Sequence, residues 1–418
     1  MKPSHTLTRY LLILSYLFQY GYAGLVMKEP IRLPIRRITH KAFNQTLNGL
    51  KQMSLGLETS LLNDLEMHEL GVQVAIGTPP QEFLLLLDSG SSDTWIPSKR
   101  CQLQDGCPSS NHYDPAASST YNASEYDYSL QYVTGSTTGN YFQDSITIGD
   151  VKNTGQFMAT IDTMTGPLVN QKAIPMLDGI LGAGFPYATS MYFRHKKLYQ
   201  PVPFSLWEKK LIPEPLYSVY VGESEHTDWA GELTFGGIDY SKIDGDILYA
   251  NIPRYNIRNG PSGVYFVWNV LVSGVRFETP EGVVGTLAAN NGYISFAVDT
   301  GSDGIFMPST DSDTLISNMI PSAEKRNSLY YVDCSYRNST QMLAFNLHPS
   351  TTNMDSERSS IQVPIGQLVR PSLTGNQCVL AIVSGNTNNF IIGNIFLRHY
   401  VTVFDFGKHR IGFGTLKK

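Results

Sequence analysis

The chain has 418 residues, which is enough for two domains that each bury a hydrophobic core. Only 16% of its residues are charged and 42% are apolar, and runs rich in Val, Ile, Thr and Tyr recur between turns, so the composition predicts an all-β protein. The formal net charge of −5 argues against a nucleic-acid partner, because phosphate binding needs a basic face.

Residues 1–23 have the features of a signal peptide. Lys2 and Arg9 are followed by an apolar run over residues 10–20, and Gly21 and Ala23 provide small residues for cleavage. The run is too short to span a bilayer, although a membrane anchor is the alternative interpretation. The last residues carry no hydrophobic tail of the kind that directs a glycolipid anchor. We therefore expect a secreted, extracellular protein without a membrane anchor.

A basic segment follows the signal peptide. Residues 1–58 contain eight Lys and Arg but only two acidic residues, which leaves 23 basic and 34 acidic residues in the rest of the chain. A cationic segment ahead of an anionic body predicts a pro-segment, residues 24–58, that electrostatic attraction holds on the body. The alternative is a basic tail with no such role. Arg36-Arg37 is a second candidate processing site.

Four cysteines follow the signal peptide, and an even number in a secreted chain predicts two disulfides. Three pairings are possible, and proximity along the chain favours Cys101–Cys107, which leaves Cys334–Cys378. Their spacing does not form the clusters that bind metals, so we expect neither a metal nor another cofactor. The acceptor motif for N-glycosylation occurs at Asn44, Asn122 and Asn338.

One pattern occurs twice in the chain. Residues 83–97 and 294–308 each run through an apolar stretch, an Asp, a hydroxyl residue, a Gly and a Ser, and each ends at a Pro. Both are followed by an apolar pair and a Gly that lies 94 residues beyond the Asp, at Gly182 and Gly393. The match in pattern and in spacing predicts two homologous lobes, which we place at residues 59–228 and 229–418.

A single Asp-Ser-Gly is usually only a turn. Two copies on equivalent strands would bring Asp88 and Asp299 face to face under two-fold symmetry. Two close carboxyl groups share one proton over an acidic range, because the charge of one raises the pKa of the other. One can activate a water while the other protonates a carbonyl oxygen, which is chemistry suited to amide hydrolysis. Neighbouring groups would hold the pair: Ser89, Gly90 and Ser91 in the first copy, and Thr300, Gly301 and Ser302 in the second.

These segments resemble the pepsin family of aspartic proteases, especially the fungal mucorpepsin type. The resemblance extends from about residue 61 to the carboxyl end and includes residues 76–81, 178–182 and 404–407. It implies a bilobal, mostly antiparallel β fold with a central cleft, polypeptide substrates, inhibition by pepstatin-type compounds and release of the chain's own pro-segment. It also implies that Asp299 is the base and Asp88 the acid. We further expect a monomer.

The resemblance also identifies a flap over the cleft. Residues 132–136 connect two strand-like runs. Tyr132 corresponds to the family's flap tyrosine, which forms a hydrogen bond with a Trp, here Trp95. Without the resemblance, Tyr132 would be interpreted as a surface aromatic residue of a strand. Thr134 stands where some fungal relatives carry an Asp, so we expect weak cleavage after Lys. Gly135 is a further residue of the flap. Three apolar residues are either walls of an apolar pocket or ordinary core residues: Leu86, Leu177 and Ile180. Asp303 replaces a usual Ser, and we expect it to face solvent.

Two other classes of protein would share part of this pattern. A catalytically silent pepsin-like binding protein would retain the fold, but both aspartates and the flap tyrosine are present. A glycoside hydrolase also uses two carboxylates, but it would not explain the hydroxyl and Gly neighbours of both. The motifs of serine and zinc hydrolases, GxSxG and HExxH, are absent from the sequence.

Overall fold

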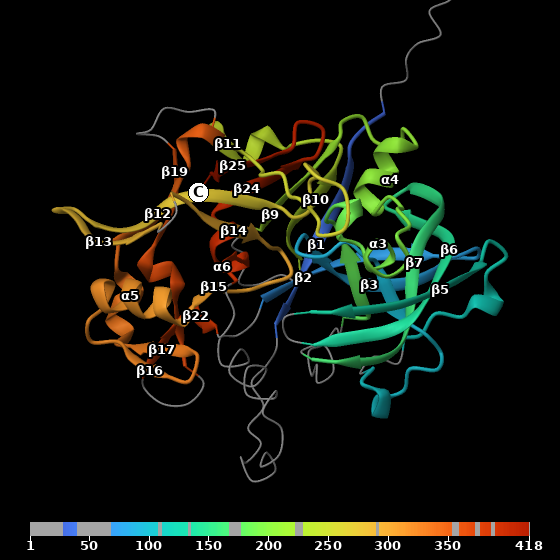
Figure 1. The fold of residues 1–418 in the computed structure, drawn as a ribbon, viewed down its shortest axis with the longest axis horizontal. Helices are drawn as coiled ribbons and strands as arrows, with labels where there is room; N and C mark the ends of the chain where they lie inside the picture. The colour runs from blue at the N-terminus through green and yellow to red at the C-terminus, as the bar shows by residue number, and fades with distance from the viewer. Residues whose placement is uncertain are drawn as a thin grey trace, which may run out of the picture.

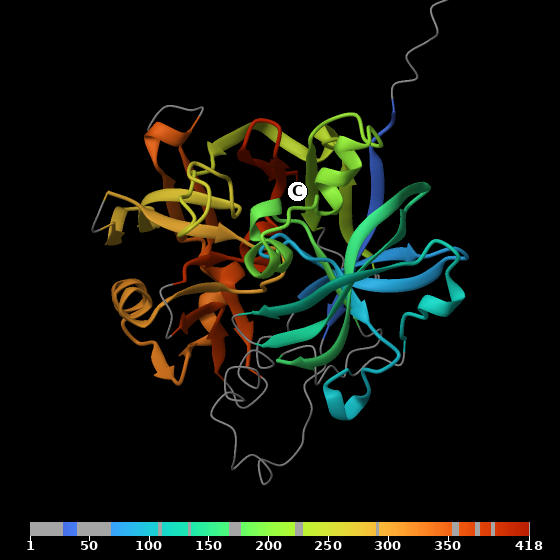
Figure 2. The ribbon, with the colours of Figure 1, turned by 45° about the vertical axis from the view of Figure 1, so that its right-hand side comes forward.

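The computed structural model describes residues 28–39, 68–107, 111–132, 135–166, 177–221, 229–289, 292–352, 359–372, 377–385 and 389–417. The predicted signal peptide, most of the predicted pro-segment and Asn44 lie outside these residues. Two β-rich lobes lie side by side, the first in cyan and green and the second in yellow to red (Figures 1 and 2). The described part of the chain is therefore mostly β structure in two lobes, as expected.

The largest sheet runs through the first lobe and continues into strands of the second. Its strands are, in spatial order, β11 (Ile243–Asn251), β25 (Arg410–Leu416), β24 (Tyr400–Asp405), β9 (Leu216–Val221), β10 (Trp229–Phe235), β1 (Ile31–Thr39), β2 (His68–Ile76), β3 (Gln81–Asp88), β8 (Gly179–Gly182), β4 (Trp95–Pro97), β7 (Val151–Thr165), β6 (Ser136–Ile148) and β5 (Asn122–Gln131).

The second lobe has two sheets of its own. The larger is ordered β19 (Ser360–Pro364), β18 (Met342–Leu347), β12 (Asn269–Thr279), β14 (Ile294–Val298), β23 (Ile391–Ile392), β15 (Ile305–Pro308) and β22 (Ile382–Gly385), with β13 (Gly282–Ala288) paired to β12. The smaller is ordered β16 (Glu324–Arg326), β17 (Leu329–Val332), β21 (Cys378–Leu380) and β20 (Val369–Pro371).

Helices in the described residues are short. They are α3 (Ser190–His195), α4 (Val202–Glu208), α5 (Ser309–Met319) and α6 (Asn394–Leu397), and 3₁₀ turns lie at Leu103–Asp105, Pro115–Ala117, Pro186–Ala188, Tyr240–Lys242, Cys334–Asn338, Pro349–Thr351 and Ile365–Leu368. None of the helices described is long and apolar enough to cross a membrane.

The repeat seen in the sequence corresponds to a repeated strand arrangement. In the first lobe β3 runs parallel to β8, and β4 pairs antiparallel with β8 and parallel with β7. In the second lobe β14, β23, β15 and β22 pair in the same way. Asp88 pairs with Gly182, and Val298 pairs with Ile392, so both parallel pairs join residues 94 positions apart. The spacing found in the sequence is thus the register of these strands.

The apolar run of β3 is buried on both of its faces. Phe83, Leu85 and Leu87 belong to the main core, which extends into both lobes, whereas Leu84 and Leu86 pack into a second cluster on the opposite face. A strand covered on both sides needs apolar residues at every position rather than at alternate ones. This explains the unbroken run of leucines before Asp88.

The close approach of the chain explains the Gly that ends β8. A Cβ atom on Gly182 would lie 2.5 Å from the carbonyl carbon of Ser92, which is closer than real Cβ atoms come. Any larger residue would push the Asp88 turn away from β8. Gly182 is therefore required by packing next to the turn.

Two disulfides are present, Cys101–Cys107 and Cys334–Cys378, with Cα atoms 5.7 and 5.0 Å apart. The pairing favoured by proximity in the sequence is confirmed. The first closes a six-residue separation beside β4, whereas the second joins β21 to a 3₁₀ turn 44 residues earlier. The glycosylation candidates Asn122 and Asn338 are both exposed.

The two disulfides should differ in their contribution to stability. A cross-link restricts the unfolded chain more when its loop is longer, by about 4 kcal/mol for the loop closed by Cys334–Cys378 and about 2 kcal/mol for that of Cys101–Cys107. We expect the Tm to fall clearly more when both cysteines of the second pair are replaced by Ser than when both cysteines of the first pair are. Calorimetry at one pH measures the two decreases. Equal losses would contradict this.

Candidate active site

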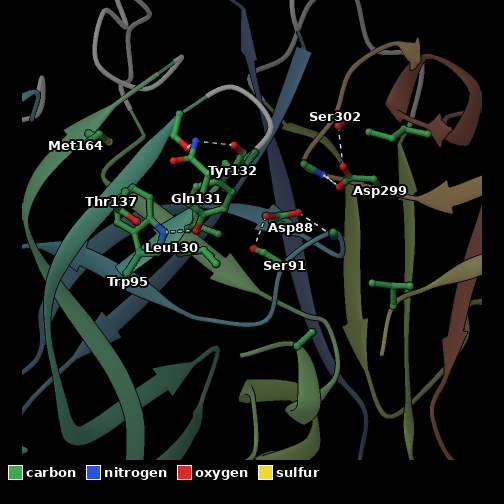
Figure 3. Close-up of a pocket in the computed structure, with 18 of the residues that line it drawn as sticks. Asp88, Ser91, Trp95, Leu130, Gln131, Tyr132, Thr137, Met164, Asp299 and Ser302 are labelled. Carbon is green, nitrogen blue, oxygen red and sulfur yellow. Dashed lines mark hydrogen bonds between the residues drawn. The ribbon is translucent and has the colours of Figure 1, made fainter. Parts of the chain in front are cut away.

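Two turns at the meeting point of the lobes carry the two aspartates. Asp88 is the last residue of β3, and Asp299 directly follows β14 (Figure 3). Each carboxylate accepts a hydrogen bond from the amide two residues later, Gly90 to Asp88 at 2.8 Å and Gly301 to Asp299 at 2.9 Å. Each also accepts one from its own lobe's serine hydroxyl, Ser91 for Asp88 and Ser302 for Asp299.

The two turns are bonded to each other by a symmetric set of hydrogen bonds. The amide of Ser89 donates to the hydroxyl of Thr300, and the amide of Thr300 donates to the hydroxyl of Ser89, both at 3.0 Å. The Ser89 hydroxyl donates to the carbonyl of Val298 (2.8 Å), and the Thr300 hydroxyl donates to that of Leu87 (2.9 Å). All of these groups are buried, so the bonds fix one lobe against the other.

The absence of side chains on the two turn glycines allows the carboxylates to meet. A Cβ on Gly90 would lie 2.6 Å from Oδ1 of Asp299, and a Cβ on Gly301 would lie 2.5 Å from Oδ1 of Asp88. Each glycine therefore lies against the aspartate of the opposite lobe. A substitution at either position would separate the pair.

The environment of Asp88 favours its protonated form. Burial is the larger effect and the nearby charge of Asp299 the second, and together they raise the pKa of Asp88 well above its ordinary value. The hydrogen bonds from Ser91 and Gly90 act in the opposite direction but do not cancel the rise. Asp88 is thus suited to hold a proton under conditions in which ordinary carboxyl groups are ionised.

A cavity of about 400 Å³ opens over the pair. The residues predicted for the site that line it are Leu86, Asp88, Gly90, Ser91, Trp95, Tyr132, Gly135, Ile180, Asp299, Gly301 and Ser302. Ser89 and Thr300 lie beneath this surface, where they connect the turns. Thr134 lies outside the described residues.

Two expectations about the cavity are wrong. Leu177 does not line it, because this residue lies just before β8, is 1% exposed and packs with Leu84 in the core of the first lobe. Asp303 does not face solvent, because the turn after Asp299 follows the cavity wall before β15 begins; the residue is 7% exposed and lines the cavity.

The predicted flap is the hairpin of β5 and β6. The amide of Tyr132 donates to the carbonyl of Gly135 at 2.7 Å near its tip. The hydroxyl of Tyr132 accepts a hydrogen bond from the indole nitrogen of Trp95 at 2.7 Å, which places the ring beside Asp88 (Figure 3). Burial raises the pKa of Tyr132, so this hydroxyl stays protonated in the working range of a carboxyl pair.

The sequence did not identify several residues that line the cavity. They come from the flap hairpin and β7, from α3 and the turn before it, from the loop before β12, and from the second lobe: Leu130, Gln131, Thr137, Met164, Thr165, Ala188, Phe193, Phe266, Val267, Phe306 and Ile391. Phe306 and Ile391 stand within the repeated segments, so the repeat could have pointed to them. Phe193 and Phe266 contact each other edge to face, 5.6 Å between ring centres, and no local pattern predicts that contact.

The described residues hold no group of three or more His, Cys, Asp or Glu side chains arranged for a metal ion. In the described part of the cavity, Asp88 and Asp299 lie face to face, with hydroxyl groups around them. Such a pair can activate a water and protonate a carbonyl oxygen at the same time. This geometry and the two-lobed β fold define an aspartic peptidase of the pepsin type.

The comparisons with known proteins lead to the same class. The chain belongs to the eukaryotic aspartyl protease family, whose model matches residues 70–416. It is 34% identical to mucorpepsin of Rhizomucor miehei over 92% of this chain and 90% of that protein, and 33% identical to mucorpepsin of Rhizomucor pusillus over the same shares. Pepsin A of Rhinolophus ferrumequinum is 27% identical over 90% of this chain and 88% of its own length. The protein is an aspartic-type endopeptidase.

The hydrogen bond from Ser91 provides a test of how Asp88 is protonated. Because this bond lowers the pKa of Asp88, Ser91→Ala should raise that pKa further. If protonated Asp88 is the required acid, the activity that wild type loses as the pH rises should persist to higher pH in the variant. The pH profile of kcat/KM measures the pH at which activity is lost on the alkaline side. A variant that loses activity at the same pH as wild type, or at a lower pH, would contradict the prediction.

Proposed function

We propose that the protein is a secreted endopeptidase, made as a zymogen, that hydrolyses internal peptide bonds at acid pH with the Asp88/Asp299 pair. The observation that carries the proposal is the approach of the two turns, in which each turn glycine lies against the opposite aspartate. The two disulfides support secretion, because such bonds persist in oxidising compartments.

The two aspartates have different roles in the proposed reaction. Asp299 takes a proton from a water, the water oxygen attacks the peptide carbonyl carbon, and Asp88 gives its proton to the carbonyl oxygen. The intermediate then collapses as the proton returns from the carbonyl oxygen to Asp88 and the leaving nitrogen takes the proton from Asp299. The raised pKa of Asp88 supports this assignment of acid and base.

The wall of the cavity supports a preference for bulky apolar residues at the cleaved bond. Leu86 and Ile180 are paired across β3 and β8 and both line the cavity near Asp88. Phe193 and Phe266 extend this apolar surface. The flap with Tyr132 and Trp95 would cover a bound peptide and exclude water. We propose a monomer that a pepstatin-type compound inhibits and that needs no cofactor.

Replacement of either aspartate tests the proposed role of the pair. We expect Asp88→Asn and Asp299→Asn each to lower kcat by about 10³-fold or more on an unfolded protein at about pH 4, because the general acid or the general base is lost. Pepstatin should abolish the wild-type activity. Activity that survives pepstatin, or that persists in a folded Asp88→Asn variant, would contradict the proposal.

The described part of the predicted pro-segment supports the zymogen. Strand β1 lies between β10 and β2 in the large sheet (Figure 1), and it buries Ile31, Leu33 and Ile35. Arg32 forms ion pairs with Glu232 at 3.4 Å and with Asp239 at 3.3 Å. None of residues 28–35, whose side chains the structure describes, lines the cavity over the aspartates. In this part, apolar burial and strand pairing hold the segment more than charge does.

The ion pairs of Arg32 predict a small, pH-dependent effect on activation. Bonds from the hydroxyl and amide of Ser241, and then the charge of Arg32, lower the pKa of Asp239. The stabilisation that ionised Asp239 gives to the folded chain is therefore complete above the ordinary pKa of an Asp side chain. It disappears as the pH falls through the lowered pKa of Asp239. Arg32 is 49% exposed, so its pairs contribute roughly 0.2–1 kcal/mol.

We expect Arg32→Gln to speed conversion to a shorter chain by up to about fivefold near pH 5, and to have little effect at the lowest pH. Gel electrophoresis measures the rate of conversion, and amino-terminal sequencing identifies the new terminus of the shorter chain, which should fall near residue 59. Lys28→Gln, which removes the same charge from an exposed side chain, is the control. An Arg32 variant that converts at the control rate at pH 5 would contradict the prediction.

A further inference from the structure

A fully buried carboxyl group between Asp88 and Trp95 takes no part in the proposed reaction. It belongs to Asp93, which lies five residues beyond Asp88 and two residues before Trp95, and whose side chain is 0% exposed. Asp93 is not among the described residues that line the cavity. Burial of a carboxyl group costs free energy unless the group is hydrogen-bonded, so its partners indicate what the residue does.

Asp93 joins three segments that are distant in the sequence. Its Oδ1 accepts hydrogen bonds from the hydroxyl groups of Tyr141 at 2.6 Å and Tyr199 at 2.7 Å, and its Oδ2 accepts one from the amide of Ser190 at 2.7 Å. Tyr141 belongs to β6, Tyr199 lies between α3 and α4, and Ser190 is the first residue of α3. These donors lie 48, 106 and 97 residues beyond Asp93, so only the fold brings them together.

The bond to β6 supports the tyrosine of the flap. The ring of Tyr141 contacts the ring of Tyr128 in β5 edge to face, with 5.3 Å between ring centres. The hydroxyl of Tyr128 lies 3.5 Å from that of Tyr132 and accepts a hydrogen bond from the hydroxyl of Thr137 at 3.3 Å. Tyr132 and Thr137 line the cavity (Figure 3). Asp93 thus holds the two tyrosines against which the flap residue rests.

The main chain connects Asp93 to the same flap residue by a second route. Trp95 follows Asp93 by two residues and donates its indole hydrogen bond to the hydroxyl of Tyr132 at 2.7 Å. Trp95 and Tyr128, which both meet this hydroxyl, are therefore each placed by the segment around Asp93. A displacement of that segment would move the flap tyrosine relative to Asp88.

The bond to Ser190 fixes a wall of the cavity. The amide of Ser190 donates to Asp93, and its hydroxyl donates to the carbonyl of Ser129 in β5 at 2.5 Å. Phe193 lies in the same helix, Ala188 lies two residues before Ser190, and both line the cavity. Because a shift at the start of α3 would move these two residues, Asp93 also sets this wall relative to the flap.

The arrangement does not depend on the charge of Asp93. Burial raises the pKa of its carboxyl group, while the hydrogen bonds from Ser190, Tyr141 and Tyr199 oppose the rise. A protonated carboxyl group can donate to a tyrosine hydroxyl, which accepts as well as donates, whereas the amide of Ser190 only donates. An Asn side chain fits the same partners, with its oxygen toward Ser190 and its amide group toward the two hydroxyl groups. Hydrogen bonding, rather than charge, is therefore what this position requires.

We propose that Asp93 is a positioning residue for substrate binding, which holds Tyr132 of the flap and the α3 wall in the arrangement that contacts the peptide. This role rests on the proposed function of the cleft. The groups that Asp93 positions contact the substrate but transfer no proton in the proposed reaction. Their displacement should weaken binding of the substrate and of the transition state alike, which raises KM and leaves kcat nearly unchanged.

Three variants, each prepared in the same way as wild type, test this role on a peptide with bulky apolar residues at the cleaved bond. Tyr141→Phe removes one bond to Asp93 but keeps the ring that contacts Tyr128, and Asp93→Ala removes the bonds to all three segments. We expect Tyr141→Phe to raise KM by about fivefold and Asp93→Ala by about tenfold or more, with kcat within about threefold of wild type. Asp93→Asn should keep KM within about twofold of wild type, because it can restore the bonds.

A second buried carboxyl group in the same lobe provides a matched control. Asp144 is also 0% exposed and accepts a hydrogen bond from the hydroxyl of Tyr113, which is itself 0% exposed. Neither residue is among the described residues that line the cavity. Tyr113→Phe removes the same kind of bond as Tyr141→Phe, so it should lower the Tm by a similar amount, measured by calorimetry, while KM stays at the wild-type value.

Each result has one meaning. An unchanged KM in Tyr141→Phe, or a rise no larger than in Tyr113→Phe, would show that Asp93 only stabilises the fold and would overturn its positioning role while peptide cleavage itself continues. A KM in Asp93→Asn as high as in Asp93→Ala would do the same. If Asp93→Ala does not fold, Tyr141→Phe still decides the question. Failure of wild type to cleave either the peptide or an unfolded protein would instead overturn the proposed function of the pair.

Discussion

The site depends on the hydrogen bonds between Ser89 and Thr300. Two carboxyl groups at close range, one buried and one half-buried, repel each other when both are ionised, and a flexible scaffold would relieve the repulsion by separating them. Four bonds between the turns oppose this, at roughly 0.5–1.5 kcal/mol each. With separation prevented, the pair relieves the repulsion by retaining a proton, and this is the proton that the proposed mechanism uses.

Much of this arrangement could be predicted from local sequence. The Asp-hydroxyl-Gly-Ser turns follow apolar strands, and the spacing of 94 residues to Gly182 and Gly393 is the register of two parallel strand pairs. The spacing is informative because a strand register permits no drift of even one residue without exchanging the faces of the strand. The tyrosine of the flap was harder to recognise, since only its resemblance to a family distinguished it from a surface aromatic.

The remaining features depend on contacts between distant segments. Phe193 of α3 and Phe266 of the loop before β12 meet across the lobes, although neither has a sequence neighbour that indicates the other. Leu177 and Ile180 are three residues apart, yet Leu177 packs only in the core whereas Ile180 also lines the cavity. They differ because Leu177 precedes β8, whereas Ile180 belongs to that strand, which orients its side chain. Asp303 was noticed as unusual, but only the fold shows that its turn forms cavity wall rather than solvent-facing surface.

The position of β1 has a consequence for the proposed processing of the chain. This strand lies inside the large sheet with neighbours on both sides, so its departure would uncover the main-chain donors and acceptors of both β2 and β10. Unpaired strand edges readily pair with other chains, which is a route to aggregation. A processed enzyme that lost β1 would remain dispersed only if another extended segment took its place or if the cut strand stayed bound. The proposed removal of residues 24–58 would therefore be as much a problem of strand exchange as of bond cleavage.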